Sequence, residues 1–358
     1  MVAAGLSSAY SIERFVGCVH PTYPLSLAQE GAGPGFWDGP WPWIILALVA
    51  TVVLVLLIIF ARYLRVSLRL FLATDMPLTA GLGTDPPIKG EVHEFPSRDG
   101  TSLKGVFIDP PAGVAARGTI VFAHEFKGDR DSAARYTAGL PEMGLRVFAF
   151  DFRGHGESPK DEPYKPSHWV TDFEVNDLLG AVAYVEATGR QPHQPVGIMG
   201  VSRGACAAVI AALHTTKIRI LVVDGLFSTD LLVEALMRRW AVIFASINLA
   251  RADRRTEIFS VLRAFTLLYA ELKMRCRYPL VRRALTRLKD VPVLFIYGQD
   301  DAYIDGDQRI TLYRVKPGAK QLWEAPGARH NQAVVAAPEE YRGRITAFLD
   351  KYMPTAQG

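Results

Sequence analysis

A run of 19 residues without a charged side chain limits what this chain can fold into more than any other feature. It extends from Trp43 to Ala61, and Thr51 is its only polar residue. As an α-helix it would be about 28 Å long, close to the thickness of the hydrocarbon core of a bilayer. A buried helix of a globular protein normally keeps a polar stripe, and this run has none. We therefore predict a transmembrane helix over residues 41–61.

The charges on either side of this run predict its orientation. Arg14 is the only Lys or Arg before it, whereas Arg62, Arg65 and Arg69 follow it directly. Cytoplasmic flanks of membrane helices are enriched in Lys and Arg. The protein is therefore expected to be a single-pass membrane protein whose large C-terminal part faces the cytoplasm.

The regions around the apolar run differ in composition. Residues 1–40 are rich in Gly, Pro and Ser and lack the basic start and short apolar core of a cleavable signal peptide, so a flexible tail is expected. In residues 62–89, Arg62, Arg65 and Arg69 recur at spacings of three and four, which places them on one helical face along which the helix can continue. Several Pro and Gly follow, so a basic juxtamembrane linker is predicted. A folded domain is expected over 90–353, followed by a short tail, 354–358.

Composition excludes several classes of protein. Hydrophobic residues make up 49% of the chain and charged residues 21%, which fits a folded protein and not a disordered one. A net charge of +4 is too small to indicate a nucleic-acid partner. Cys18, Cys206 and Cys276 are too scattered for a disulfide framework or a zinc site. No metal or organic cofactor is expected, and the oligomeric state is left open.

Beyond residue 90, short apolar runs alternate with longer segments. Two runs around the turn at 98–101 predict a β-hairpin, 92–95 and 103–108. Further strands are predicted at 119–123, 146–150, 196–201, 220–224, 293–297 and 321–324. Helices are predicted at 132–143, 167–187, 203–214, 307–315 and 338–352. This alternation predicts an α/β fold with a mostly parallel sheet covered by helices on both faces.

The motif Gly200-Val201-Ser202-Arg203-Gly204 lies between a predicted strand and a predicted helix. In that setting, the pattern Gly-x-Ser-x-Gly forms a sharp turn that presents the serine for nucleophilic attack. The glycines let strand and helix approach closely, and the helix N-terminus stabilises developing negative charge. Ser202 is therefore a candidate nucleophile, although a tight turn with an ordinary serine remains the alternative.

A serine nucleophile needs a base, and the base needs an acid that fixes its tautomer. Asp300 and Asp301 follow the predicted strand 293–297, and His330 follows the last predicted strand. Both positions lie at the sheet edge where open α/β sheets place their sites. The chain order Ser, Asp, His predicts a catalytic triad in which either aspartate can be the acid.

These motifs resemble the α/β-hydrolase superfamily over about residues 90–353. Within it, the chain is most similar to the membrane-anchored hydrolases of the Bem46-like and serine-aminopeptidase-like group. The resemblance implies Ser202 as nucleophile, His330 as base and Asp301 as acid, because the family spacing Gly-x-x-Asp-x-x-aliphatic matches Gly298, Asp301 and Ile304. It also includes the loop 151–158, Asp-Phe-Arg-Gly-His-Gly-Glu-Ser, which we interpret as structural.

By position in the family, the backbone N–H groups of Phe126 and Arg203 form the oxyanion hole. The loop departs from the family pattern because Glu125 stands where relatives usually have Gly. Its carboxylate would repel anionic substrates, bind a cationic group or point into solvent, and we expect solvent. His124-Glu125 is not a zinc motif, since no second His follows at the required spacing.

The segment at about 230–290 corresponds to the place where the superfamily carries a helical lid. Between residues 231 and 290 there are 13 Lys and Arg against five Asp and Glu, and two apolar segments, 240–250 and 259–270. A basic lid with apolar segments is suited to an anionic membrane surface. The alternative is a soluble lid with a solvated basic face.

Together these features predict a membrane-anchored serine hydrolase that cleaves a carboxylic ester, either a small molecule or a lipid. A lipophilic ester is favoured by the membrane anchor. A thioesterase or peptidase with the same triad is the alternative among enzymes. A non-catalytic membrane scaffold that uses the fold for binding is the alternative from another class.

Overall fold

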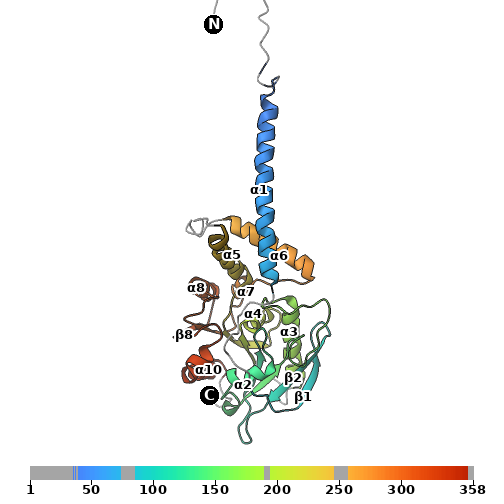
Figure 1. Ribbon diagram of the computed structural model, residues 1–358. Coiled ribbons are helices and arrows are strands. Elements are labelled where there is room, and N and C mark those ends of the chain that lie inside the picture. The colour runs from blue at the N-terminus through green and yellow to red at the C-terminus, as the bar shows by residue number, and fades with distance from the viewer. Residues whose placement is uncertain are drawn as a thin grey trace, which may run out of the picture. The chain divides into compact units, whose positions relative to one another are not determined.

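The computed structural model describes residues 35, 37, 39–73, 85–188, 194–245 and 257–353, without the side chains of 240–245. The chain divides into two compact units between Leu57 and Ile58. The predicted tails lie outside the described residues, except for residues 35, 37, 39 and 40. Figure 1 shows the arrangement of the elements within each unit.

The predicted transmembrane segment is helical. It belongs to α1 (Trp41–Leu72), which is long and apolar enough to cross a membrane, and none of its most apolar stretch is buried in protein. The helix extends beyond the predicted span and continues through Arg62, Arg65 and Arg69 to Leu72. The first part of the predicted juxtamembrane linker is therefore helical. Residues 74–84 of that predicted linker lie outside the described residues.

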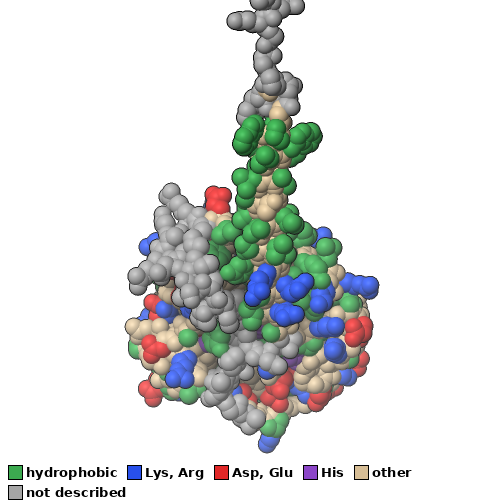
Figure 2. Space-filling model, turned by 45° about the horizontal axis from the view of Figure 1, so that its top comes forward, with side chains coloured by type: hydrophobic (Ala, Val, Ile, Leu, Met, Phe, Trp, Pro, Cys, Tyr) green, Lys and Arg blue, Asp and Glu red, His purple; other side chains and the backbone are tan. Residues whose placement is uncertain are grey.

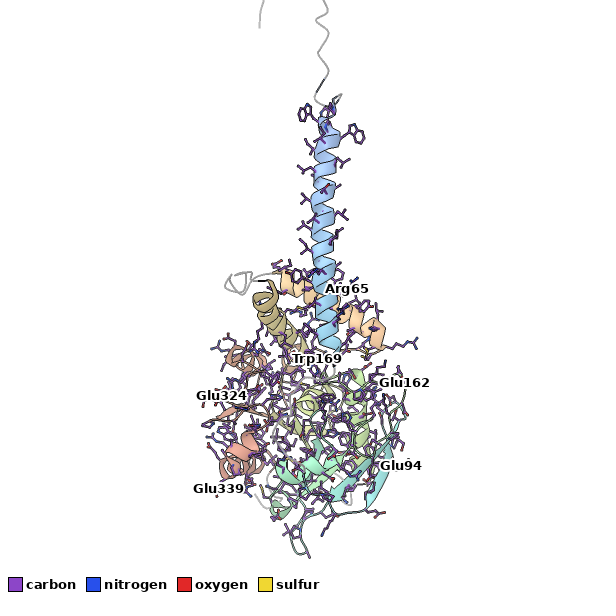
Figure 3. All side chains as sticks on the ribbon, in the orientation of Figure 1. Arg65, Glu94, Glu162, Trp169, Glu324 and Glu339 are labelled. Atoms are coloured by element: carbon purple, nitrogen blue, oxygen red, sulfur yellow. The ribbon has the colours of Figure 1, made fainter. Side chains whose placement is uncertain are left out.

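The C-terminal end of α1 packs into the hydrophobic core of the second unit. The Phe71 ring stacks on Trp169 with centroids 4.8 Å apart and meets the edge of Tyr278 at 5.0 Å. Trp169 Nε1–H also donates a hydrogen bond of 2.8 Å to the Phe71 carbonyl. Figure 3 labels Trp169 next to this end of α1. The folded unit thus includes residues well before the predicted start at residue 90.

Within the described residues, eight strands form one sheet in the order β1-β2-β4-β3-β5-β6-β7-β8. The strands are β1 (Val92–Pro96), β2 (Ser102–Ile108), β3 (Gly118–Ala123), β4 (Leu145–Phe150), β5 (Val196–Val201), β6 (Ile218–Asp224), β7 (Val293–Gly298) and β8 (Lys320–Ala325). Strand β2 runs antiparallel to β1 and β4, and the remaining pairs are parallel. The predicted hairpin and the mostly parallel sheet are confirmed.

Helices cover both faces of the sheet. They are α2 (Ala133–Tyr136), α3 (Asp172–Thr188), α4 (Arg203–Ala211), α5 (Thr229–Ala245), α6 (Glu257–Met274), α7 (Val281–Leu285), α8 (Gly306–Val315), α9 (Ala333–Ala336) and α10 (Pro338–Tyr352). Along β3, Val121 and Ala123 pack in the cluster with α3 and α4, whereas Ile120 and Phe122 pack in the cluster with α2 and α10. Both faces of a central strand are buried, as its uninterrupted apolar sequence predicts.

Two predicted helices differ from the structure. The segment 132–143 is broken into α2 and a short 3₁₀ turn, Pro141–Met143, with Gly139 and Gly144 at positive φ on either side. Helix α3 begins at Asp172 and not at residue 167. Thr171 caps it, because its Oγ1 accepts the Phe173 N–H at 3.2 Å while Glu174 accepts the Thr171 N–H at 2.8 Å. This reciprocal arrangement fixes the helix start.

The predicted insertion contains α5, α6 and α7, between β6 and β7. The apolar segment predicted at 259–270 lies in α6, whereas the one at 240–250 falls outside the described side chains. The described part of the basic segment is mostly helical, as expected.

Candidate active site

Ser202 lies in the turn between β5 and α4. Its backbone has φ +52° and ψ −112°, a strained combination for a residue with a side chain. A Cβ on Gly200 would lie 2.6 Å from the Gly204 carbonyl oxygen, and one on Gly204 would lie 2.1 Å from the Ala123 carbonyl oxygen. Both glycines are therefore needed for the close approach of strand and helix, as the motif predicts.

His330 lies beside Ser202 although 128 residues separate them in the sequence. The distance from Ser202 Oγ to His330 Nε2 is 2.9 Å. His330 follows β8 on a turn in which Asn331 has φ +58°. Both side chains are almost completely buried. A neutral imidazole with its acceptor nitrogen toward Ser202 is placed to take the hydroxyl proton.

The structure distinguishes the two adjacent aspartates. Asp301 Oδ2 lies 2.7 Å from His330 Nδ1, and its Oδ1 accepts the N–H groups of Tyr303 at 2.8 Å and Ile304 at 3.0 Å. Burial raises the pKa of Asp301, but the hydrogen bond from His330 and these backbone donors outweigh it and lower the pKa below its ordinary value. Asp300 is exposed. Of the two aspartates, Asp301 is therefore the one that contacts the imidazole.

The two predicted oxyanion donors lie on turns that leave backbone N–H groups available. Arg203 is the first residue of α4, where N–H groups have no intrahelical acceptor. Phe126 lies within a turn closed by a 3.1 Å hydrogen bond from the Gly128 N–H to the Glu125 carbonyl. Lys127 in this turn has φ +66°. This loop connects β3 to the short helical turns before α2.

Glu125 is buried, so the expectation that it points into solvent is wrong. Only 4% of the residue is exposed, and Ser132 Oγ donates to its Oε2 at 3.4 Å. Burial raises the pKa of Glu125 to about 7. A Cβ on Gly128 would lie 2.8 Å from the Glu125 carboxyl carbon, so Gly128 makes room for this side chain. The Glu125 carboxyl group is therefore enclosed by the loop and hydrogen-bonded to Ser132.

His124 anchors the same loop. Its Nδ1 lies 2.7 Å from the Glu125 carbonyl, and its Nε2 accepts the Phe152 N–H at 3.1 Å. These contacts assign the proton to Nδ1 and leave the ring neutral. Burial, with the neighbouring His155 and Arg203, holds the pKa of His124 well below its ordinary range. His124 thus has a structural place next to the site.

The side chain of Arg203 makes contacts that the sequence did not predict. Its fully buried guanidinium donates to the Ser167 carbonyl at 3.0 Å, lies 3.4 Å from the Glu174 carboxylate and lies 3.2 Å from His155 Nε2. Burial and the charge of Arg203 lower the pKa of His155 and of His168 to about 3. The first turn of α4 is therefore tied to the loop before α3.

Asp224, at the end of β6, was also missed. Its carbonyl accepts the Ser202 N–H at 2.7 Å, and its Oδ2 accepts the Tyr341 hydroxyl at 3.0 Å. Burial raises the pKa of Asp224 to about 7. The sequence around β6 did not predict these contacts of Asp224, because Tyr341 lies 117 positions away in the chain.

The contacts of the loop 151–158 agree with a structural role. Asp151 accepts the Arg130 N–H at 2.7 Å and the Glu157 N–H at 3.0 Å. Arg153 is buried and donates from Nε to Asp177 at 2.9 Å. Asp151 and Arg153 of this loop therefore form hydrogen bonds with other groups of the protein.

Comparison with known proteins gives consistent matches. The model of a family described as the alpha/beta hydrolase family matches residues 120–344. Protein YfhR of Escherichia coli K12 is 36% identical over 169 residues, which cover 46% of this chain and 56% of YfhR. The YfhR of Escherichia coli O157:H7 is 31% identical with the same coverage, so the chain spans about half the length of these relatives. Protein YqkD of Bacillus subtilis is 27% identical over 72% of this chain and 78% of its own length.

Solved structures show the same fold. The Pyrococcus furiosus esterase Pf2001 has a TM-score of 0.55 at 22% identity, covering 76% of this chain and 98% of the esterase. A thermophilic esterase from Thermogutta terrifontis has a TM-score of 0.50 at 20% identity, covering 74% and 100%.

Proposed function

The chain belongs to the alpha/beta hydrolase family, and we propose that it is a membrane-anchored serine hydrolase that cleaves a lipophilic carboxylic ester. The observation that carries this proposal is the pair of hydrogen-bond distances that links three side chains. Ser202 Oγ lies 2.9 Å from His330 Nε2, and His330 Nδ1 lies 2.7 Å from Asp301 Oδ2. A hydroxyl, an imidazole and a carboxylate in this order form a nucleophile, a base and an orienting acid.

In the acylation step, Ser202 Oγ attacks the ester carbonyl carbon while His330 Nε2 takes the hydroxyl proton. The oxygen that becomes negative is stabilised by the backbone N–H groups of Phe126 and Arg203 and by the N-terminus of α4. The carbon–oxygen bond to the alcohol then breaks, and His330 returns its proton to the leaving oxygen.

In the deacylation step, His330 takes a proton from water, whose oxygen attacks the acyl carbon. The bond to Ser202 breaks, Ser202 regains its proton from His330, and the carboxylic acid leaves. Asp301 remains ionised and holds the imidazolium that forms in each step. A carboxylate whose pKa lies below its ordinary value suits this role.

The membrane part of the proposal is supported by α1. Its uncharged stretch is long enough to span a bilayer, and Arg62, Arg65 and Arg69 follow that stretch, which favours a cytoplasmic catalytic domain. This organisation also fits the similarity to Bem46-like and serine-aminopeptidase-like membrane hydrolases. An anchored enzyme meets substrates that partition into the bilayer, which favours a lipophilic ester over a thioester or a peptide.

The proposal is tested with the purified full chain in a neutral detergent and a panel of p-nitrophenyl esters, acyl thioesters and aminoacyl amides. We expect the esters to be the best substrates, with kcat/KM rising with acyl length, and Ser202→Ala to lose roughly 10⁵- to 10⁶-fold in kcat. Ser102→Ala, on the surface hairpin, is the matched control and keeps its activity. Turnover by Ser202→Ala within tenfold of the unmodified chain would exclude the proposed nucleophile, and a preference for thioesters or amides would change the substrate class.

A further inference from the structure

Helix α6 exposes an apolar face. Its exposed large apolar side chains recur at intervals of three and four residues, which places them on one side of the helix. They are 47–72% exposed, and they are Ile258, Val261, Phe265, Leu268, Tyr269 and Leu272. The adjoining side of the helix packs on the domain through Phe259, Leu262, Thr266 and Ala270. A surface helix normally carries polar residues on its outer side, so this face indicates an interaction surface.

The apolar face of α6 adjoins the end of the uncharged stretch of α1. Phe265 meets the edge of Phe60 with ring centroids 5.5 Å apart, and Ala61 is the last residue of the stretch. The face therefore borders Phe60 and Ala61, the last residues of the stretch that we propose to lie in the bilayer. This contact points to lipid, and not to a second protein, as the material that covers α6.

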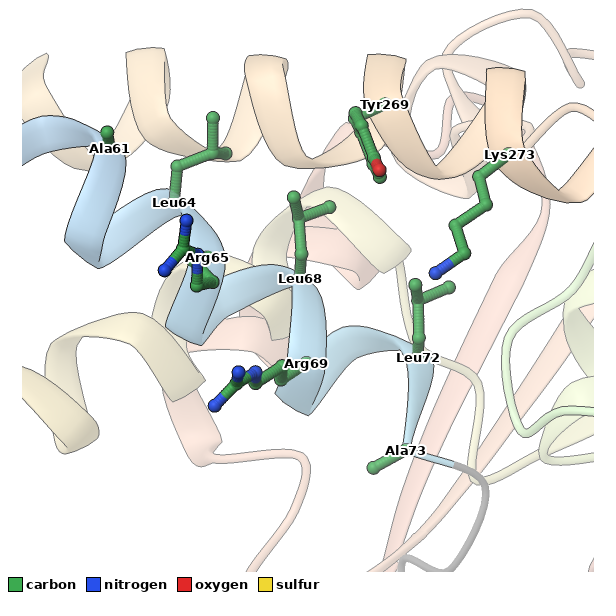
Figure 4. Close-up of a pocket in the computed structure, with 9 residues that line it drawn as sticks. All are labelled: Ala61, Leu64, Arg65, Leu68, Arg69, Leu72, Ala73, Tyr269 and Lys273. Atoms are coloured by element: carbon green, nitrogen blue, oxygen red, sulfur yellow. The ribbon is translucent and has the colours of Figure 1, made fainter.

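Between the two helices lies a groove of about 510 Å³, within the range of small-ligand sites. Figure 4 shows Leu64, Leu68 and Leu72 of α1 along one wall and Tyr269 of α6 on the other. These leucines give the groove an apolar wall. That wall suits an acyl chain.

Cationic side chains line the same groove. Arg65 and Arg69, one helical turn apart on α1, and Lys273 on α6 contribute to its lining. Among the residues that the structure describes, none of these three cations has an ion-pair partner. A second hollow of about 500 Å³ shares both arginines and adds Arg62. Figure 2 shows Lys and Arg side chains gathered beside apolar ones around the C-terminal part of α1.

We infer that the groove between α1 and α6 binds an anionic phospholipid, with its phosphate at Arg65, Arg69 and Lys273 and an acyl chain along the leucines, and that the apolar face of α6 lies in the membrane interface. Guanidinium groups bind phosphate oxygens in a fork geometry. This inference rests on the proposed membrane anchoring. It assigns the lipid contact to α1 and α6 and not to the basic residues of α7, where Arg282 pairs with Asp230 at 3.0 Å.

The test uses the full chain in a neutral detergent and native mass spectrometry. The added ligands are dioleoyl phosphatidylglycerol, dioleoyl phosphatidylcholine and inorganic phosphate. We expect phosphatidylglycerol to bind at least tenfold more tightly than phosphatidylcholine, and phosphate alone to leave lipid binding unchanged. Arg65→Gln/Arg69→Gln should weaken phosphatidylglycerol binding by at least tenfold. Competition by phosphate at similar concentration would exclude a lipid site, because the acyl chain would then contribute nothing.

The matched control is Arg283→Gln/Arg287→Gln, which removes the same charge at the same spacing from exposed positions near α7. It should bind phosphatidylglycerol like the unmodified chain. Equal loss in both double variants would overturn the inference, since binding would then be diffuse. A photoreactive phosphatidylglycerol, with a diazirine on its acyl chain, should label α6 in nanodiscs, and Leu272→Asp should reduce that labelling. Unchanged labelling in this variant would overturn the interfacial position of α6.

Lipid binding is measured without turnover, so the inference and the proposed activity fail separately. Ser202→Ala should bind phosphatidylglycerol as the unmodified chain does. Normal lipid binding by a chain without esterase activity would refute only the proposed reaction. Normal esterase activity with no preference for phosphatidylglycerol would refute only the lipid site.

Discussion

Asp300 and Asp301 are adjacent in the sequence but have different surroundings. Asp301 is buried and faces His330 Nδ1, whereas Asp300 is exposed. Asp301→Asn replaces the acceptor oxygen by a group that favours the wrong imidazole tautomer, so we expect kcat to fall by roughly 10³- to 10⁴-fold. Asp300→Asn should change kcat by no more than about twofold, as is usual for surface substitutions. Steady-state ester hydrolysis measures both, and the reverse ranking would move the acid to Asp300.

Glu125 predicts a pH dependence of stability. Burial raises its pKa from an ordinary value of 4.5 to about 7, so the folded protein binds the proton more tightly than the unfolded chain does. The associated stability is complete below pH 4.5 and is lost as the pH rises through 7, a total of roughly 3 kcal/mol. Glu125→Gln removes this term. We expect its Tm to fall less between pH 5 and pH 8 than the Tm of the unmodified chain.

Thermal unfolding of the full chain in detergent at the two pH values provides the measurement. The pKa of Asp224 is also raised to about 7, so Glu125→Gln should reduce the pH dependence without abolishing it. Glu142→Gln, at an exposed position, is the matched control and should keep the full pH dependence. If the Tm of Glu125→Gln changes between pH 5 and pH 8 as much as that of Glu142→Gln, Glu125 does not cause the pH dependence of stability.

The last turn of α1 is an element of the hydrolase core. Phe71 is 3% exposed and packs between Trp169 and Tyr278. Phe71→Ala should lower the free energy of unfolding by about 3 to 5 kcal/mol, the usual effect of removing a buried aromatic ring. Val66→Ala, at a 39% exposed position of the same helix, should have little effect. Chemical unfolding in detergent distinguishes them, and equal stability of the two variants would show that α1 ends outside the core.

The strands and the long helices could be predicted because their signals are local. Short apolar runs predicted β3 to β7, and α10 was predicted with the bounds that the structure has. The start of α3 depends on the Thr171–Glu174 cap, a signal present in the sequence but not used. The end of α1 could not be predicted, because its packing on Trp169 joins residues 98 positions apart.

Some features of the candidate site could likewise be predicted from the sequence, and others could not. The elbow around Ser202 follows from a local motif, and the placement of His330 follows from the order of the strands. The residues alone left both aspartates open, and the family spacing selected Asp301. The burial of Glu125 was not predictable, since it depends on space that Gly128 leaves beneath the loop. The contacts of the Arg203 side chain could not be predicted either, because its partners lie far from it in the sequence.

At the scale of the whole molecule, a bilayer-length helix and a hydrolase domain belong to one chain. The last turn of that helix is part of the domain core, and Phe60 of α1 contacts Phe265 of α6. The helix that we propose to span the membrane therefore also packs on the hydrolase domain.

The residue of the intact chain that a serine-directed reagent modifies identifies the nucleophile directly. The full chain in phospholipid nanodiscs is treated with a fluorophosphonate, digested and mapped by mass spectrometry. We expect a single modified residue, Ser202. Labelling should be lost in Ser202→Ala and reduced by orders of magnitude in His330→Ala, because the hydroxyl then has no base. Modification of another serine, or equal labelling of the folded His330→Ala variant, would contradict this expectation.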